Sequence, residues 1–343
     1  MLELLNTLYV TTPGAYVRLD HETVRVEADG AKLLQVPVLH LRGIVCFGNV
    51  MVSPAVMQRF AQDRRSVVFL DDRGRFAARV QGPTAGNVLL RWEQYEAARS
   101  LARSAAIARA IVGGKIQNAR FLLQRAARET PDSAESKTLR DCVADLAGIL
   151  ERLKAASEIN VIRGLEGEAA RRYFGSWDLM IKRDRQAFAL QGRQRRPPTN
   201  PMNALLSFLY TLLTGECIAA AEGVGLDPQI GYLHELRPGR PALALDLVEE
   251  LRPSVADRLA IALINLRQAT SDDFVTRPGG AIHLSDAGRK KVIVAYERRK
   301  QEQVYHPVLD RKVPIGLIPH VQARLLARHL RGDLDHYVPW LYR

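Results

Sequence analysis

The chain has 343 residues, of which 47% are hydrophobic and 25% are charged. This length corresponds to about two domains, and the composition is typical of globular proteins. Collagen-like, disordered and disulfide-rich classes are thereby excluded. We expect no membrane span, because the best apolar candidate, 36–52, is interrupted by His40 and Arg42. The chain holds three cysteines without a CxxC pair, Cys46, Cys142 and Cys217. Their apolar settings favour the reducing cytoplasm and argue against a cysteine-held zinc site.

The balance of charge indicates the kind of partner. Lys and Arg number 49 against 37 Asp and Glu, a formal net charge of +12. Such an excess favours a polyanion, with nucleic acid ahead of an acidic membrane surface. Residues 1–90 contain ten basic and eight acidic residues, and the remainder contains 39 and 29. We therefore expect the polyanion to bind mainly to the second part of the chain.

The first ninety residues have the pattern of β-structure. Turn formers separate six short runs rich in branched and aromatic residues, at 7–11, 15–19, 23–27, 44–47, 66–70 and 75–80. One segment, 53–62, has a helical pattern, with Ser53 as N-cap and Pro54 in the first helical position. The spacing predicts a small sheet or sandwich.

After Gly82 and Pro83 the apolar period changes to three or four residues, which is typical of helices. The predicted helices are 92–112, 115–129, 134–155, 159–177, 201–222, 243–251, 254–266, 285–303 and 318–330. The sequence therefore predicts an α+β protein. A small N-terminal β domain, 1–91, is followed by a larger all-α domain, 92–343.

Two basic segments are candidates for contact with DNA phosphates, which Arg and Lys bind without reading sequence. The first contains Lys182, Arg183, Arg185, Arg193, Arg195 and Arg196. The second contains Arg289, Lys290, Lys291, Arg298, Arg299 and Lys300. The alternative interpretation of each segment is a solvated charged face.

A group of acidic residues follows a histidine near residue 240. Asp246, Glu249 and Glu250 are spaced so that a helix places them on one side. His234 stands twelve residues before Asp246, and the turn at 238–241 would let it fold back over that helix. One imidazole with two or three carboxylates suits Mg²⁺ or Mn²⁺ better than a structural zinc ion. A solvated acidic face with a structural histidine is the alternative.

A third acidic candidate is Glu166, between Leu165 and Gly167, where a small-residue face can approach another helix. Its alternative role is that of a surface glutamate. The sequence contains no Gly-rich phosphate loop, Gly-x-Ser-x-Gly elbow, HExxH motif or Cys/His nucleophile pair. Nucleotide hydrolases, serine hydrolases and zinc peptidases are therefore disfavoured.

Taken together, the motifs resemble the family of CRISPR-associated spacer-acquisition integrases, the universal adaptation endonucleases of CRISPR systems. The resemblance covers essentially the whole chain and is carried by 6–11, 44–48, 86–91, 115–120, 165–167, 200–208, 231–234 and 246–253. The stretches 288–291 and 319–323 are similar to the form found beside type I-C interference genes.

The resemblance implies a β-sandwich-like N-terminal domain and a helical catalytic domain. It implies metal ligation by Glu166, His234 and Glu249, with Asp246 as a further acidic residue of the catalytic site and Mg²⁺ or Mn²⁺ as cofactor. Some family members carry Asp at the position of Glu249. The family's DNA-stacking tyrosine corresponds to Tyr210. The implied assembly is a homodimer, two of which flank a dimer of the small second adaptation protein in a heterohexamer on double-stranded DNA.

The implied reaction suits these residue types. Integration is a transesterification in which a DNA 3′-hydroxyl attacks a phosphodiester, and a divalent metal assists it without a nucleophilic side chain. Two alternatives stay open. One is a metal-dependent nuclease acting on branched or single-stranded DNA in repair, and the other is a non-catalytic DNA-binding scaffold. The scaffold is disfavoured because it would need none of the three ligands.

Overall fold

The computed structural model describes residues 4–82, 87–190, 192 and 198–342. The chain divides into two compact units, Met1–Ala85 and Gly86–Arg343. The sequence predicts the boundary at 91 and the first helix of the second domain from Trp92. The helix α2 (Val88–Arg99) begins earlier, because the Asn87 side chain accepts a hydrogen bond from the Leu89 N–H at 2.9 Å and caps it.

The first unit contains two four-stranded sheets. One has the order β1 (Asn6–Val10), β5 (Leu41–Phe47), β7 (Ser66–Leu70) and β8 (Phe76–Val80). The other has the order β4 (Ala31–Pro37), β3 (Thr23–Ala28), β2 (Tyr16–Asp20) and β6 (Met51–Val52). Strands β1, β5 and β7 are parallel, whereas β2, β3 and β4 are antiparallel. The prediction of an N-terminal β region is confirmed.

A single apolar core joins both sheets and the helix α1 (Pro54–Gln62). Val17 and Val24 come from one sheet, Ile44 and Val67 from the other, and Phe60 from α1. The sequence missed β4 because its first five residues are all exposed, so that no apolar alternation marks it.

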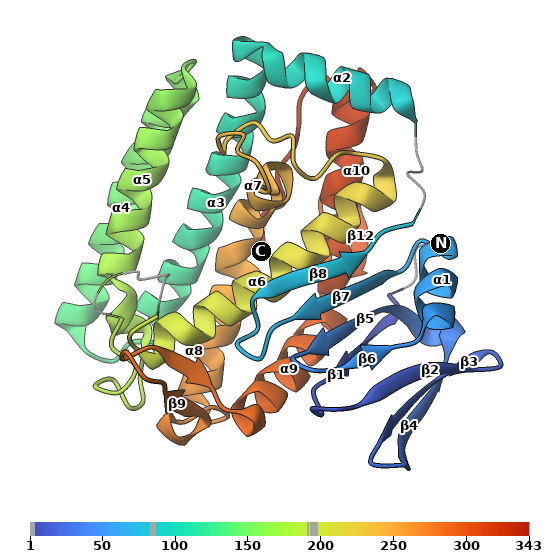
Figure 1. The fold of residues 1–343 in the computed structure, drawn as a ribbon. Helices are drawn as coiled ribbons and strands as arrows, with labels where there is room; N and C mark the ends of the chain where they lie inside the picture. Colours follow the sequence, from blue (N-terminus) through green and yellow to red (C-terminus); the bar gives the residue numbers. More distant parts are fainter. Residues whose placement is uncertain (1–3, 83–86, 191, 193–197, 343) are drawn as a thin grey trace. The chain divides into compact units, whose positions relative to one another are not determined.

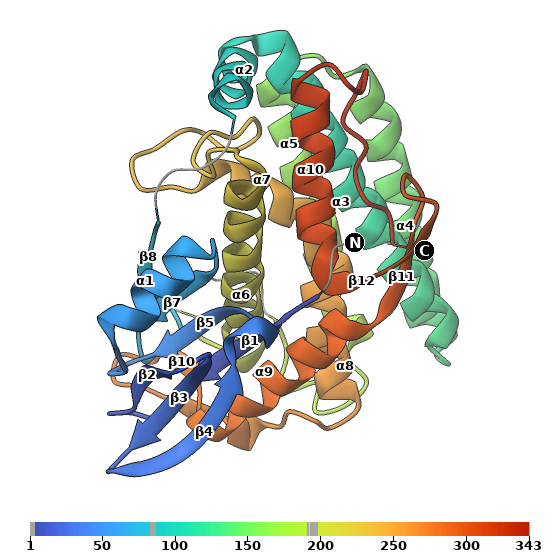
Figure 2. The ribbon, with the colours of Figure 1, turned by 90° about the vertical axis from the view of Figure 1, so that its right-hand side faces the viewer.

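The second unit is mostly helical (Figures 1 and 2). After α2 its helices are α3 (Leu101–Glu129), α4 (Ser133–Ala155), α5 (Ile159–Gly175), α6 (Pro201–Val224), α7 (Ala242–Leu251), α8 (Arg258–Asn265), α9 (Asp286–Gln301) and α10 (Ile318–Leu330). Helices α4 and α5 lie along α3, while α7 packs on α3, α6 and α10. A π-helical segment, η3 (Arg252–Asp257), connects α7 to α8.

Two short hairpins add strands to a domain that was expected to be entirely helical. They are β9 (Phe274–Thr276) with β10 (Ile282–Leu284), and β11 (Gln303–His306) with β12 (Arg311–Pro314). Strands of three or four residues are too short to show a period of two, which explains why the sequence did not reveal them.

Helix α6 is the apolar core helix of this unit. Among the described residues, α6 is the one helix that is long and apolar enough to cross a membrane, with a mean hydropathy of 1.6 over 18 residues. However, 61% of that 18-residue window is buried inside the protein. The expectation that 36–52 is the best apolar candidate for a span is therefore wrong, since α6 is longer and more apolar. Its burial is the pattern of a core helix rather than of a membrane span.

Helices α3 and α7 approach each other closely at Gly114. A Cβ atom on Gly114 would lie 2.6 Å from Pro339 Cβ and 3.3 Å from Glu250 Cβ, so a larger residue would force the segments apart. The close approach brings Lys115, the next residue of α3, beside the acidic helix α7.

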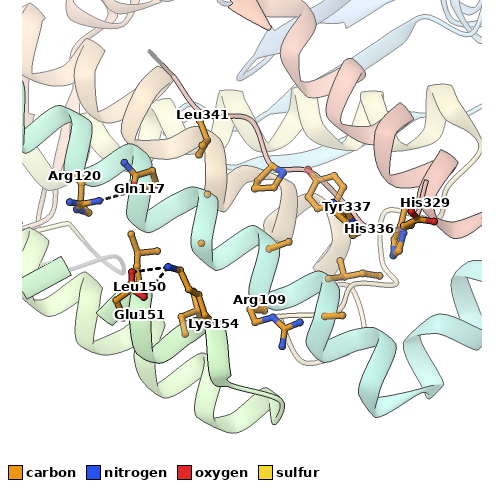
Figure 3. A pocket seen from close by; sticks show the side chains of 18 of the residues that line it. Arg109, Gln117, Arg120, Leu150, Glu151, Lys154, His329, His336, Tyr337 and Leu341 are labelled. Carbon is orange, nitrogen blue, oxygen red and sulfur yellow. Dashed lines mark hydrogen bonds and ion pairs between the residues drawn. The ribbon is translucent and has the colours of Figure 1, made fainter. Parts of the chain in front are cut away.

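A pocket of about 720 Å³ lies between α3, α4 and the C-terminal segment (Figure 3). Its lining includes Arg109, Gln117, Lys154 and Tyr337, and its exposed wall is largely apolar. None of the predicted site residues lines it. The predicted site lies elsewhere in the unit.

Candidate metal centre

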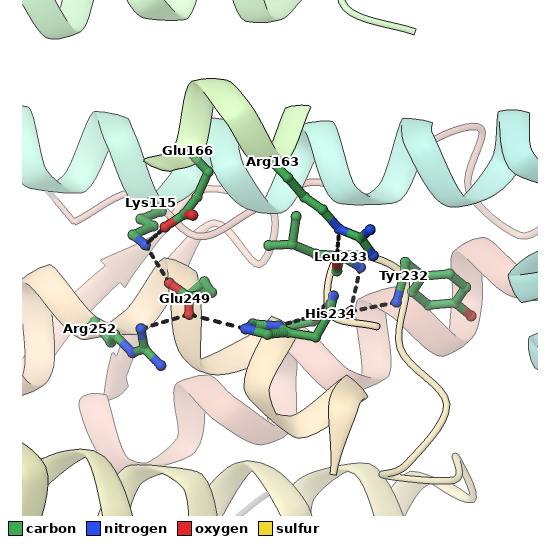
Figure 4. A network of polar contacts seen from close by, with 9 residues as sticks. Lys115, Arg163, Glu166, Tyr232, Leu233, His234, Glu249 and Arg252 are labelled. Carbon is green, nitrogen blue, oxygen red and sulfur yellow. Dashed lines mark hydrogen bonds and ion pairs between the residues drawn. The ribbon is translucent and has the colours of Figure 1, made fainter. Parts of the chain in front are cut away.

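The three predicted ligands come from separate segments. Glu166 and Glu249 contact the ammonium group of Lys115, and His234 lies beside the other carboxylate oxygen of Glu249 (Figure 4). Glu166 lies on α5, His234 on the loop before α7, and Glu249 on α7 itself. Lys115 Nζ contacts Glu166 Oε1 and lies 2.6 Å from Glu249 Oε2. His234 Nε2 is 3.8 Å from Glu249 Oε1. The structure therefore brings the predicted residues together, with a lysine among them.

Asp246 fixes the position of His234. Its carboxylate is fully buried and accepts backbone N–H bonds from Tyr232 at 2.6 Å, Leu233 at 3.0 Å and His234 at 3.0 Å. The same carboxylate lies 2.7 Å from the Nδ1 of the His234 ring. Because an ionised carboxylate only accepts hydrogen bonds, the ring proton belongs on Nδ1. The lone pair of Nε2 is then left on the side of Glu249.

The loop that carries His234 packs tightly against the start of α7. A Cβ atom on Gly231 would lie 2.6 Å from both Asp246 Oδ2 and the Ala242 carbonyl carbon, so the loop needs glycine there. From α5, Arg163 Nε donates to the Leu233 carbonyl at 2.7 Å. Contacts from two helices therefore hold the histidine in place.

Glu249 is buried and surrounded by positive charge. Its Oε1 is 2.7 Å from Arg252 Nη1, and its Oε2 is 2.6 Å from the Lys115 ammonium. Burial alone would raise the pKa of Glu249, but the positive charges of Arg252 and Lys115 outweigh burial and hold that pKa at about 2. Burial would lower the pKa of Lys115, but Glu249 and Glu166 raise it. Both groups are charged at neutral pH.

Arg252 is fixed by a second set of contacts. It is the first residue of η3, and its guanidinium lies 4.7 Å from the centroid of the Tyr210 ring. The Tyr210 hydroxyl donates to Asp257 at 2.6 Å, and the Tyr173 hydroxyl donates to the same carboxylate at 2.9 Å. Arg252 is therefore held between Glu249 and an aromatic ring that is itself anchored.

Lys115 and Arg252 were not predicted as site residues from the sequence. The spacing of three residues between Glu249 and Arg252 on one helix was an available signal for an ion pair. A lysine directly after Gly113 and Gly114, in the middle of a mostly apolar helix face, was a weaker signal for a buried cation.

The site fits a divalent cation by its chemistry. Within the described residues, no three His, Cys, Asp or Glu side chains are arranged closely enough to hold a metal ion. The Lys115 ammonium stands between the carboxylates of Glu166 and Glu249. Two carboxylates and an imidazole whose orientation Asp246 fixes form a donor set suited to Mg²⁺ or Mn²⁺. The ammonium already marks a position for positive charge.

Tyr210 is placed differently from a base-stacking residue. Its side chain is buried, with 9% exposed, its hydroxyl is bonded to Asp257, and Arg252 lies over its ring. In this arrangement the ring supports Arg252 and offers no open face to a base. Stacking on DNA stays a prediction without support from the structure.

The first basic segment is partly described. Arg183 and Arg185 are exposed, and Arg185 forms an ion pair with Glu135 at 2.6 Å. Arg193, Arg195 and Arg196 lie outside the described residues.

The second basic segment, on α9, contains both exposed and buried residues. Lys290 and Lys291 are exposed, and Lys291 Nζ lies 2.7 Å from Asp273. The expectation that the whole cluster contacts DNA is corrected for three buried members, Arg289, Arg299 and Lys300. Lys300 is 1% exposed and pairs with Glu216 at 2.7 Å. The sequence could not separate these residues because charges occur all round α9, on its buried side as well.

Comparison with known proteins identifies the family. The family model described as "CRISPR associated protein Cas1" matches residues 8–298. The chain belongs to the Cas1 family. The CRISPR-associated endonuclease Cas1 1 of Moorella thermoacetica is 55% identical over 340 residues, covering 99% of both chains. The CRISPR-associated endonuclease Cas1 2 of Rhodospirillum rubrum is 48% identical over 347 residues, covering 100% of both.

Solved Cas1 structures have the same fold. TM1797, a Cas1 protein from Thermotoga maritima, matches with a TM-score of 0.81 and 25% identity, covering 96% of this chain and 97% of that one. A chain of a Cas6-RT-Cas1–Cas2 complex matches with a TM-score of 0.82 and 23% identity, covering 98% of this chain and 36% of that one. A casposase bound to its integration product matches with a TM-score of 0.83 and 20% identity, covering 97% of this chain and 93% of that one. The last two likenesses concern the fold alone.

Proposed function

We propose that this Cas1-family protein is a divalent-metal-dependent DNA endonuclease and integrase that inserts short double-stranded DNA into a CRISPR array. The observation that carries the proposal is the proximity of three residues from separated segments. Glu166 and Glu249 meet at the Lys115 ammonium, and His234 Nε2 lies 3.8 Å from Glu249. The endonuclease names of relatives that match over the full length support the same activity.

In the proposed reaction, a 3′-hydroxyl of the incoming DNA attacks a phosphodiester of the repeat. A new bond forms between that oxygen and phosphorus, the bond to the repeat's own 3′-oxygen breaks, and the displaced strand keeps that oxygen as a hydroxyl. A Mg²⁺ or Mn²⁺ ion, when bound, supplies Lewis-acid stabilisation of the charge that develops on phosphate and leaving oxygen.

The residues of the chain have separate roles in this proposal. Glu166, Glu249 and the Nε2 atom of His234 would hold the ion. Asp246 keeps the imidazole turned toward Glu249 and sets its tautomer. Arg252 keeps Glu249 ionised in its buried setting.

We propose double-stranded DNA as the substrate and place its phosphate contacts on the second unit. Residues after 90 contain 39 basic and 29 acidic residues. The exposed side chains Arg183, Lys290 and Lys291 provide positive charge, and Arg193, Arg195 and Arg196 stay candidates from the sequence.

The proposed assembly is a homodimer that joins the small second adaptation protein, Cas2, in a heterohexamer. A solved complex of a chain with this fold contains Cas1 and Cas2, which supports the partner. We place the dimer contact on the first unit, which has only two more basic than acidic residues over 1–90. Light scattering tests the dimer, and an intact chain that stays monomeric at micromolar concentration would contradict it.

An integration assay tests the function. Supercoiled plasmid carrying the repeat and a short duplex are incubated with the protein and Mg²⁺ or Mn²⁺. We expect joined products with either metal and none with chelator. Nicking without joining would instead identify a nuclease in which water replaces the 3′-hydroxyl.

Alanine at Glu166, His234 or Glu249 should abolish joining while the melting curve and DNA binding are kept. The matched control is Glu235→Ala, since Glu235 is an exposed glutamate beside His234 that pairs with Arg237. Full joining by His234→Ala or Glu166→Ala would refute the site. Loss of joining together with loss of folding would favour a structural role for these residues.

A further inference from the structure

The ammonium of Lys115 occupies the centre of the acidic site. Its side chain is 13% exposed and extends from α3 toward the carboxylates of Glu166 on α5 and Glu249 on α7. Without a cation between them, these two carboxylates would repel each other in a poorly hydrated setting. Lys115 therefore supplies the charge that lets α3, α5 and α7 meet.

The two cations at Glu249 are held differently. Arg252 has two supports, the Glu249 carboxylate and the Tyr210 ring, and Tyr210 is anchored in turn by Asp257. Within the described part of the chain, the polar contacts of the Lys115 ammonium are the two carboxylates themselves. Arg252 is thus a fixed part of the site, whereas Lys115 is held only by the groups that would bind a metal ion.

Lys115 also occupies the position that a metal ion needs. Glu166 and Glu249 would both hold the ion, and the Lys115 ammonium now contacts these two carboxylates. A lysine side chain has four rotatable methylene units, so its ammonium can leave this position without any movement of α3. Metal and ammonium therefore exclude each other.

We infer that Lys115 is the resident counter-cation of the metal centre, which holds Glu166 and Glu249 together in the metal-free protein and is displaced when a divalent ion binds. The inference rests on the proposed metal site. Exchange of a monovalent for a divalent cation adds one positive charge among the same ligands. The released ammonium stays within a side-chain length of the ion, where it can bind a phosphate oxygen of the DNA.

The test is direct Mn²⁺ binding without DNA, measured by calorimetry and by the shift in melting temperature. Lys115→Met removes the competing charge and keeps the aliphatic stem. We expect at least a tenfold tighter Kd for Mn²⁺, a lower melting temperature without metal, and a larger rise on adding Mn²⁺ than in the wild type. A variant that folds only with Mn²⁺ would support the inference equally.

Two further variants separate charge from structure. Lys115→Arg keeps a cation and should keep the weaker affinity of the wild type. Lys154→Met removes a lysine that pairs with Glu151 on the exposed side of α4, and it should change neither Kd nor the metal-dependent shift.

The outcomes distinguish this inference from the proposed site. If wild-type protein binds Mn²⁺ and Glu249→Gln abolishes binding, the metal site stands. Unchanged or weaker Mn²⁺ binding by Lys115→Met would then overturn the counter-cation role alone. If neither wild type nor Lys115→Met binds Mn²⁺, the metal site itself is refuted and the inference with it.

Discussion

His234 Nδ1 lies 2.7 Å from Asp246 Oδ1, and Asp246 also accepts the backbone N–H of His234 at 3.0 Å. One buried carboxylate thereby fixes both the ring and the main chain of the same histidine. The pairing leaves Nε2 on the side of Glu249, 3.8 Å from its Oε1. Asp246 is a positioning residue in this arrangement, since its own oxygens are used by hydrogen bonds.

Asp246→Asn should weaken the site without removing a ligand. An amide nitrogen in place of one oxygen must face backbone N–H groups, so Tyr232 or His234 loses its acceptor. We expect Mn²⁺ affinity to fall about 10- to 100-fold, as for other residues that orient a ligand. The free energy of unfolding should fall by about 1–3 kcal/mol for each buried donor left without a partner.

Mn²⁺ titration and urea unfolding check this prediction. Wild-type affinity in Asp246→Asn would show that the orientation of His234 does not matter. Total loss of binding, equal to that of Glu249→Gln, would indicate that Asp246 is itself a ligand.

Tyr210→Phe tests whether the tyrosine supports the site or stacks on DNA. The substitution removes the hydroxyl bonded to Asp257 at 2.6 Å but keeps the ring under Arg252. We expect stability to fall by about 1.5–3 kcal/mol, the value typical of a hydrogen bond to a charged group, with DNA affinity unchanged. Tyr305→Phe is the control, because Tyr305 is exposed and bonds to an exposed Asp310. A large loss of DNA affinity at unchanged stability would support stacking.

Two adjacent residues on α9 should behave in opposite ways. Lys290 is exposed, whereas Arg289 is 7% exposed and lies 3.4 Å from Asp286. Lys290→Ala should lower the slope of log affinity against log salt on duplex DNA by about 0.9, the value for one lost phosphate contact. Arg289→Ala should leave the slope unchanged and lower the melting temperature. The reverse pattern would contradict the assignment of burial on this helix.

Arg195→Ala with Arg196→Ala extends the same test to the first basic segment. Each lost phosphate contact should again lower the slope by about 0.9. An unchanged slope would show that these two arginines are not phosphate contacts.

Glu250 should make stability depend on pH. Its buried carboxyl accepts hydrogen bonds from Tyr337 at 2.6 Å, Gln322 at 3.1 Å and the Trp340 N–H at 3.2 Å. Burial raises the pKa of Glu250 to about 7 from the ordinary 4.5, and the three donors oppose that rise. The folded state therefore holds the proton more tightly than the unfolded state. The contribution of Glu250 to stability is present below pH 4.5 and is lost as pH rises to about 7.

The loss is on the order of 3 kcal/mol, since each unit of pKa difference is worth about 1.4 kcal/mol. Urea unfolding from pH 4 to 8 measures it. The difference in stability between wild type and Glu250→Gln should shrink as the pH rises. A difference that is constant over this range would show that Glu250 has an ordinary pKa in the folded protein.

Local signals explain which helices the sequence placed well. α1 begins after Ser53, whose side chain accepts from the Val56 N–H, and α10 has the predicted bounds Ile318–Leu330. In contrast, 92–112 and 115–129 were predicted as two helices separated near Gly113. The chain breaks instead at Ser100, which caps α3, and continues through Gly114 because Pro339 and Glu250 pack against it. That packing depends on residues more than a hundred positions away.

The candidate site likewise contains residues that the sequence indicated and residues whose role only the structure reveals. The family resemblance implied Glu166, His234 and Glu249 as ligands and Asp246 as a further acidic residue. The hydrogen bonds by which Asp246 orients His234 are visible only in the structure. The position of Lys115 between the carboxylates depends on how closely α3 and α7 approach, which no local pattern encodes. Arg252 and Tyr210 likewise acquire their roles from a π-helical segment that sequence periodicity did not predict.

The most direct measurement is a crystal structure of the full chain soaked with Mn²⁺, with an anomalous difference map. We expect one strong peak bounded by the carboxylates of Glu166 and Glu249 and by His234 Nε2, with Asp246 still bonded to Nδ1 and the Lys115 ammonium moved away. A peak elsewhere, or no peak at saturating Mn²⁺ with Lys115 still between the two carboxylates, would contradict it.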